Sequence, residues 1–264
     1  MNAIFYAFLA TLGTWFVTAL GAGTVIFFKS SGGKWLNAML GFAAGVMIAA
    51  SFWSLLQPAI ELSEKNGFPS WLAVILGFVP GALFIWISDK AVTKIQKKTD
   101  IKPVLEKKSH KRIFMLVMAI TLHNIPEGLA VGVCFGALAQ NNSPEAFWAA
   151  VSVAVGIGLQ NFPEGAAVSI PLRREGCSKL KSFLYGQASG LVEPIAGIAG
   201  ALLVTSVSAI LPFALSFAAG AMILVAVHEL IPECQKDREI SPYFSTMGII
   251  AGFSSMMLLD VMLG

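Results

Sequence analysis

Charged residues are scarce in this sequence. Only 12% of its 264 residues are Asp, Glu, Lys or Arg, whereas a soluble globular domain carries about 25%. Hydrophobic residues make up 56% of the chain, and the mean hydropathy is +0.75. The apolar residues fall in blocks of about 20, the length of helix that crosses a bilayer core of ~30 Å. The composition excludes an ordinary soluble domain and predicts an all-α membrane protein with several spans.

Cysteine is also rare, and no basic segment precedes the first apolar run. The three cysteines, Cys134, Cys177 and Cys234, have no CxxC spacing. A disulfide framework or a zinc knuckle is therefore not indicated. The first apolar run is too long for the core of a cleavable signal peptide, so it is expected to be the first membrane span.

The hydropathy pattern predicts eight transmembrane helices in a single transporter domain, 1–264. Alternate loops hold 17 of the 18 Lys and Arg, and the opposite set of loops holds only Lys65. By the positive-inside rule both termini are extracytoplasmic, and the basic segment 92–112 is a cytoplasmic loop between spans 3 and 4. The net charge of +3 follows from this topology and does not indicate a nucleic-acid partner. The predicted spans are 3–28, 36–58, 69–91, 113–139, 145–171, 181–206, 209–232 and 242–263.

Two internal repeats organise these spans. HNIPEG at 123–128 in span 4 matches QNFPEG at 160–165 in span 5, 37 residues later. FAAGVMI at 42–48 in span 2 resembles FAAGAMI at 217–223 in span 7. Spans 2 and 7 cross the membrane in opposite directions, which predicts a 3+2+3 inverted repeat around the central pair of spans. Inverted repeats of this kind are typical of secondary transporters, whose sites lie near the midplane.

The central pair carries polar side chains with helical spacing. His123 and Glu127 are four residues apart, as are Gln160 and Glu164, so each pair shares a helix face. The proline at position 126 or 163 cannot donate to the carbonyl one turn earlier, which predicts a bend and a free carbonyl in each helix.

A third buried carboxylate, Glu193, lies in span 6. Each charge at a helix centre costs about 2.5–3.5 kcal/mol on insertion scales, and no Lys or Arg lies in the interior of spans 4, 5 or 6. Protons or a bound cation must then neutralise these groups. A mixed nitrogen and oxygen ligand set suits zinc, iron or manganese better than a hard alkaline-earth ion. The candidate metal ligands are His123, Asn124, Glu127, Gln160, Asn161, Glu164 and Glu193.

A second polar group ends span 7 as HELIPE, 228–233. This differs from the zinc-protease signature HExxH because Pro232 stands where the second His would be. Asp89 and Asp260 fall near span ends, where a charge can reach the interface cheaply. The candidates for a secondary site or for the transport path are His228, Glu229, Ser51, Ser54 and Asp89.

With these motifs the chain resembles the ZIP (Zrt/Irt-like) family of divalent metal transporters, most of all its bacterial, GufA-like branch. The resemblance implies transport of Zn²⁺, and also of Fe²⁺, Mn²⁺ or Cd²⁺, into the cytoplasm, with the metal as substrate and not as cofactor. It implies alternating access, spans 1, 4, 5 and 6 moving against spans 2, 3, 7 and 8, and a location in the bacterial inner membrane. It further implies a binuclear site. One metal would be held by His123, Glu127, Gln160 and Glu164, and the other by Asn124, Asn161, Glu164 and Glu193.

Two other functions stay open on the sequence alone. The buried carboxylates could serve as the proton relay of a carrier for an organic solute. An intramembrane enzyme is disfavoured because no nucleophile–base pair is evident. A bundle rich in Gly and Ala is also compatible with a homodimer.

Overall fold

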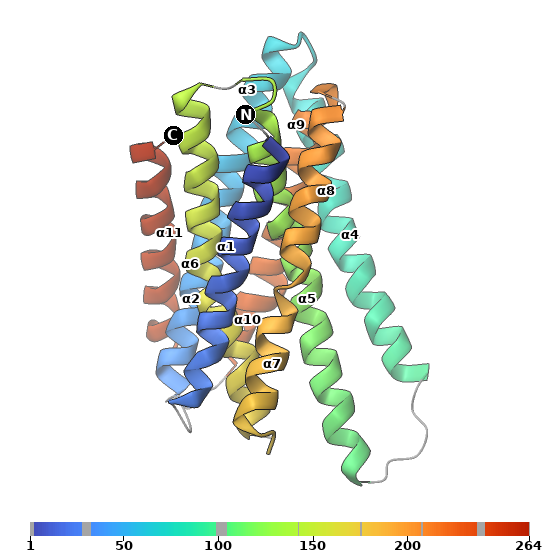
Figure 1. Cartoon of the computed structure of the whole chain (residues 1–264), viewed down its shortest axis with the longest axis vertical. Helices are drawn as coiled ribbons and strands as arrows, with labels where there is room; N and C mark the ends of the chain where they lie inside the picture. Colours follow the sequence, from blue (N-terminus) through green and yellow to red (C-terminus); the bar gives the residue numbers. More distant parts are fainter. Residues whose placement is uncertain are drawn as a thin grey trace.

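Helices make up the fold throughout the part of the chain that the computed structural model describes (Figure 1). The described residues are 3–27, 33–98, 105–141, 143–174, 176–206, 208–236 and 241–263. The α-helices are α1 (Ala3–Gly23), α2 (Gly33–Ala50), α3 (Gln57–Lys65), α4 (Ser70–Lys98), α5 (Leu105–Ala137), α6 (Pro144–Arg174), α7 (Lys179–Ser189), α8 (Val192–Ser206), α9 (Leu211–Val225), α10 (Ile231–Cys234) and α11 (Tyr243–Leu263). Short 3-10 turns, Thr24–Ile26 and Ser208–Ile210, follow α1 and precede α9.

These helices form the predicted membrane spans. Seven helical segments of the described chain are long and apolar enough to cross a membrane, and α5 covers the remaining predicted span, 113–139, as far as Ala137. The start of α1 and the end of α11 lie at the same end of the bundle, beside α3 (Figure 1). The predicted loop 92–112 is largely helical, because α4 continues to Lys98 and α5 begins at Leu105.

The two halves of the chain pack with the same register. A methyl group on Gly81 of α4 would collide with the carbonyl of Phe217 in α9, and one on Gly252 of α11 would collide with the carbonyl of Phe42 in α2. Phe42 and Phe217 are the first residues of the matched segments in spans 2 and 7. The same pair of helix contacts therefore occurs twice, α4 on α9 and α11 on α2, which supports the inverted repeat.

Spans 2 and 7 also share an irregularity that the sequence did not reveal. The helix widens to a π-helix at Ser51–Leu56 in span 2 and at Ala226–Leu230 in span 7. A proline, Pro58 or Pro232, follows each segment closely. Because a proline has no N–H to donate, its helix must find another hydrogen-bond pattern there, and a π turn supplies one. By contrast, α5 and α6 are continuous through Pro126 and Pro163.

Span 6 is divided in two. Helix α7 ends at Ser189, and α8 begins at Val192, so Glu193 lies in the first turn of α8. The positive end of a helix dipole favours a carboxylate at this position. The break therefore places Glu193 where its negative charge is stabilised.

Helix α1 turns a stripe of small and hydroxylic residues inward. Its buried positions include Thr11, Thr14, Thr18 and Gly21, whereas large side chains such as Phe16 are exposed on the opposite face. Lipid tails are as apolar as leucine, so membrane helices associate through small residues that allow close approach. This stripe is the face of α1 that borders the candidate site.

Candidate metal site

Polar side chains from α5, α6 and α8 meet in the interior of the bundle. Their relative exposures are 0% for Asn124, Glu127, Gln160, Asn161 and Glu193, and 4% for Glu164. Burial of carboxylates in an apolar environment is costly unless they are paired with donors or with a cation. Such a cluster is expected at a binding site and not in a packing core.

The glycine after each central glutamate brings the neighbouring helix to the site. A methyl group on Gly128 would collide with the backbone of Glu193 in α8, and one on Gly165 would collide with the carbonyl of Thr18 in α1. The repeated Pro-Glu-Gly therefore provides both a carboxylate and a close helix contact. Through these contacts α8 packs against α5 and α1 packs against α6, next to the cluster.

Glu193 is saturated with hydrogen-bond donors. Thr14 Oγ1 donates a short hydrogen bond to Glu193 Oε2, and Thr18 Oγ1 lies 3.4 Å from Oε1. Asn161 Nδ2 lies 3.0 Å from Oε1 and 2.9 Å from Oε2. Both carboxylate oxygens of Glu193 thus have two donors each.

The remaining members of the cluster have far fewer partners. Gln160 Nε2 donates to Glu127 Oε1 at 2.6 Å, and Asn124 Nδ2 donates to the carbonyl of Ser189 at 2.9 Å. Six buried oxygen atoms of the cluster accept no hydrogen bond: Asn124 Oδ1, Glu127 Oε2, Gln160 Oε1, Asn161 Oδ1, Glu164 Oε1 and Glu164 Oε2. Leaving such an atom unsatisfied in a protein interior costs about 1–3 kcal/mol, and more when it is charged.

All six oxygens belong to α5 and α6, and all are of a type that coordinates cations. A cation placed among them would satisfy several at once and neutralise two carboxylates. Among the side chains that the structure describes, no three His, Cys, Asp or Glu are grouped closely enough to hold a metal ion by themselves. The amide oxygens of Asn124, Gln160 and Asn161 would therefore be needed, beside the carboxylates, to complete the coordination of a metal ion. The side chain of His123 lies outside the described part, so its assignment as a ligand stays a prediction.

The residues predicted for a secondary site belong to spans 2, 3 and 7, and not to the helices that carry this cluster. Ser51 is buried and donates to the carbonyl of Met47. His228 is exposed, and Glu229 is half-buried, both in the π-helical segment of span 7. Asp89 is half-buried in α4. Their role in a transport path stays a prediction.

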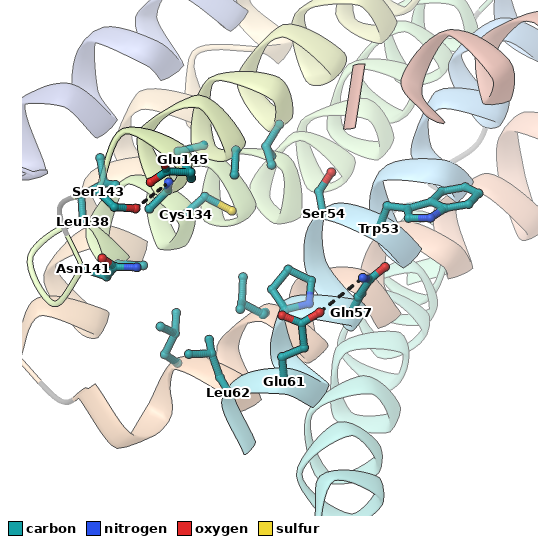
Figure 2. Close-up of a pocket in the computed structure, with 18 of the residues that line it drawn as sticks. Trp53, Ser54, Gln57, Glu61, Leu62, Cys134, Leu138, Asn141, Ser143 and Glu145 are labelled. Carbon is teal, nitrogen blue, oxygen red and sulfur yellow. Dashed lines mark hydrogen bonds between the residues drawn. The ribbon is translucent and has the colours of Figure 1, made fainter. Parts of the chain in front are cut away.

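Ser54 instead lines a pocket of about 630 Å³ at the end of the bundle that holds α3 (Figure 2). Its Oγ donates to Asp260 Oδ1 at 2.7 Å, and Ser152 Oγ lies 3.2 Å from the same atom. The thiol of Cys134, Gln57 and Glu61 also line the pocket (Figure 2). The pocket thus joins spans 2, 4, 5, 7 and 8, and the carboxylates of Glu61, Glu145 and Asp260 line it.

Apolar side chains separate the pocket from the central cluster. Val131 of α5, Ile157 of α6 and Ala50 of α2 are fully buried and belong to one apolar core. Val131 lies between Glu127 and Cys134 along α5, and Ile157 lies between Val153 and Gln160 along α6, in each case over about 10 Å for seven helical residues. The described pocket therefore ends before it reaches the glutamates.

Comparison with known proteins identifies the family. Residues 105–260 match the family model described as Zip, ZIP Zinc transporter. The chain belongs to the ZIP family. It is 38% identical to "Zinc transporter ZIP11" of Homo sapiens, over 100% of this chain and 98% of that protein. It is 35% identical to "Zinc transporter GufA" of Myxococcus xanthus, over 94% of each chain. It is also 34% identical to "Zinc transporter ZIPB" of Bordetella bronchiseptica, over 98% of this chain and 82% of that one.

Membership of the ZIP family confirms several predictions at once. The chain is an integral, multi-pass membrane protein of a transporter family whose substrate is a divalent metal, and it is not an enzyme. The likeness to GufA and ZIPB agrees with the predicted bacterial, GufA-like branch.

Three residues with a part in these sites were missed at the level of sequence. Nothing in the sequence except their spacing on one face of α1 indicated that Thr14 and Thr18 contact the site. Asp260 was taken for a charge near a span end, but it accepts hydrogen bonds from Ser54 and Ser152.

Proposed function

We propose that this ZIP protein carries divalent transition-metal ions, with Zn²⁺ as the first candidate and Fe²⁺, Mn²⁺ and Cd²⁺ as others, into the cytoplasm through the central cluster. The observation that carries the proposal is the set of six buried oxygens without hydrogen-bond partners on α5 and α6. A cation is the simplest partner for oxygens that are acceptors only and include two carboxylates.

The first centre would use Glu127, Glu164 and the Gln160 amide oxygen, with the imidazole of His123 as the predicted nitrogen ligand. Imidazole and carboxylate ligands together favour zinc and its neighbours over calcium or magnesium. A second centre, as the resemblance implies, would draw on Asn124, Asn161, Glu164 and Glu193. Its loading depends on Glu193, whose oxygens already accept hydrogen bonds.

Alternating access is supported by how the helices are connected. The hydrogen bonds and close contacts of the cluster join spans 1, 4, 5 and 6 to one another, as in the bonds of Asn161 to Thr14 and Glu193. The glycine contacts of spans 2, 3, 7 and 8 join α4 to α9 and α2 to α11. A movement of one set of four spans against the other would carry the site intact from one side to the other.

The pocket around Asp260 would be the entrance from the outside, since it opens at the end of the bundle that holds both termini. The inner end of the path would include Asp89, His228 and Glu229. Protonation of the ligands on that side would weaken their hold on the metal, because metal ligands bind in their deprotonated form. The bacterial inner membrane as location, and a homodimer, are part of the same proposal.

Flux measurements on purified protein in liposomes test this proposal. We expect Glu127→Ala and Glu164→Ala each to abolish saturable Zn²⁺ uptake, because each removes an anionic ligand, while the protein still inserts. Glu233→Ala is the matched control, since its carboxylate is 58% exposed and pairs with Lys236 three residues later. Unchanged zinc uptake in either central variant would refute the proposal. Uptake of an organic solute that neither zinc nor cadmium inhibits would favour the organic-solute carrier.

A further inference from the structure

The two halves of the central cluster differ in how their negative charge is compensated. Glu164 has no hydrogen-bond partner on either oxygen, and Glu127 has one amide donor on one oxygen. Glu193 has donors on both oxygens and sits at the N-terminus of α8. Hydrogen-bond donors favour the charged form of a buried carboxylate, so Glu193 needs a cation less than the other two do.

We propose that Thr14, Thr18 and Asn161 form a latch that holds Glu193 in its metal-free state and keeps the second centre closed until the first is filled. The two centres then bind in a fixed order, the second ion more weakly than the first. The inference rests on the proposed transport function and names Thr14 and Thr18 as positioning residues for the metal.

The orientation of the Asn161 amide is set by its surroundings. Its nitrogen lies within hydrogen-bond distance of three acceptors, both Glu193 oxygens and the carbonyl of Thr14 at 3.1 Å. A rotated amide would place Oδ1 against three oxygens, which is repulsive. In the latched state Asn161 therefore presents donors to Glu193 and cannot offer its oxygen to an ion bound there.

Each threonine hydroxyl has a second acceptor on its own helix. Thr14 Oγ1 lies 3.0 Å from the carbonyl of Thr11, and Thr18 Oγ1 lies 3.4 Å from the carbonyl of Thr14. A hydroxyl has a single proton, so each threonine donates either to Glu193 or to its own helix. When an ion takes over a Glu193 oxygen, the hydroxyl turns to the helix carbonyl and stays satisfied.

The charges of the cluster give the order of binding. One divalent ion neutralises Glu127 and Glu164, whose four oxygens include three without any partner. A second ion must displace the donors of Glu193 and also approach an ion already bound nearby. Both effects weaken the second step.

Zinc titration by calorimetry, on the full chain in lipid nanodiscs at constant pH, measures the two steps directly. For the unmodified protein we expect one tight step and a second that is weaker by about tenfold or more, the scale of one charged hydrogen bond. In the double variant Thr14→Val, Thr18→Val, which keeps the side-chain shape but removes both hydroxyls, we expect the second step to tighten about tenfold. The first step should change little. The matched control Thr14→Ser, Thr18→Ser retains the hydroxyls and should bind as the unmodified protein does.

A second variant covers the case in which the valine protein does not fold. Asn161→Asp replaces the donating amide by a carboxylate, so two ions should bind with similar affinity. Equal steps in the unmodified protein, or a second step that neither the valine variant nor Asn161→Asp tightens, would overturn the latch while leaving transport intact. Absence of any zinc binding in the unmodified protein would instead refute the proposed function.

Discussion

The buried glutamates of this protein differ in the number of hydrogen bonds that they accept. Glu164 is 4% exposed and has no hydrogen-bond partner, whereas Glu193, as deeply buried, accepts several hydrogen bonds. The same side chain therefore has two roles, set by the helices around it. One carboxylate is open to a ligand, and the other is occupied by the protein itself.

Asp260 gives a prediction at this scale. Its carboxylate lines the pocket near α3 and accepts hydrogen bonds from Ser54 and Ser152. We expect Asp260→Asn to raise the zinc concentration for half-maximal uptake several-fold and to leave the maximal rate nearly unchanged, because only capture is impaired. Concentration dependence of liposome uptake measures this.

The control for that prediction is Glu145→Gln, which removes a more exposed carboxylate from the rim of the same pocket. An equal effect of both changes would mean that the pocket attracts metal only through its overall charge.

The central carboxylates were predictable from sequence for a physical reason. A buried charge without a basic partner is expensive in a membrane, so Glu127, Glu164 and Glu193 stood out in apolar spans. Thr14 and Thr18 did not, because a threonine in a membrane helix can satisfy its hydroxyl on its own backbone. Nothing in the sequence distinguishes such a threonine from one that donates across to another helix.

At the scale of helices, close contacts are concentrated at glycines. Gly165 lies against the carbonyl of Thr18, so a methyl group there must push α1 away from α6. We expect Gly165→Ala to lower the melting temperature of the purified protein and to reduce zinc uptake at least about tenfold, because displacing α1 also displaces the partners of Glu193.

Gly158→Ala is the matched control on the same helix. A methyl group at Gly158 meets only Val17 Cγ2, at 3.8 Å, which is ordinary contact. Alanine has the higher helix propensity, by about 1 kcal/mol in water, so this variant should be at least as stable as the unmodified protein. Equal damage at both positions would mean that the contact with α1 is not the cause.

The positions of the spans followed from hydropathy, but the helix ends and the irregular segments did not. Helix α4 continues to Lys98 and α5 begins at Leu105, beyond the predicted bounds of 91 and 113. Proline at 126, 163 or 232 looks alike in the sequence. The structure keeps α5 and α6 continuous through the first two and widens span 7 to a π-helix before the third. The contacts that neighbouring helices make around each proline decide whether the helix stays regular. The residues next to the proline in the sequence do not reveal those contacts.

For the whole molecule the topology is the main prediction still to be tested. We expect cysteines introduced at Asn66, in the turn after α3, and at Gly264 to react with a membrane-impermeant thiol reagent in intact cells. A cysteine at Lys107 should react only after the membrane is opened, because it belongs to the basic segment that the positive-inside rule places in the cytoplasm. The opposite labelling pattern would invert the proposed direction of transport.

The inverted repeat has a consequence for the direction of flow. Asp260 lies eight residues after Gly252 in α11, and Asp89 lies eight residues after Gly81 in α4, so the repeat places an aspartate at corresponding positions towards the two ends of the path. If the two ends of the path have equivalent structures, neither direction of transport is favoured by the protein. We therefore expect a reversible carrier, in which the gradients across the membrane and not the protein decide the net movement of metal.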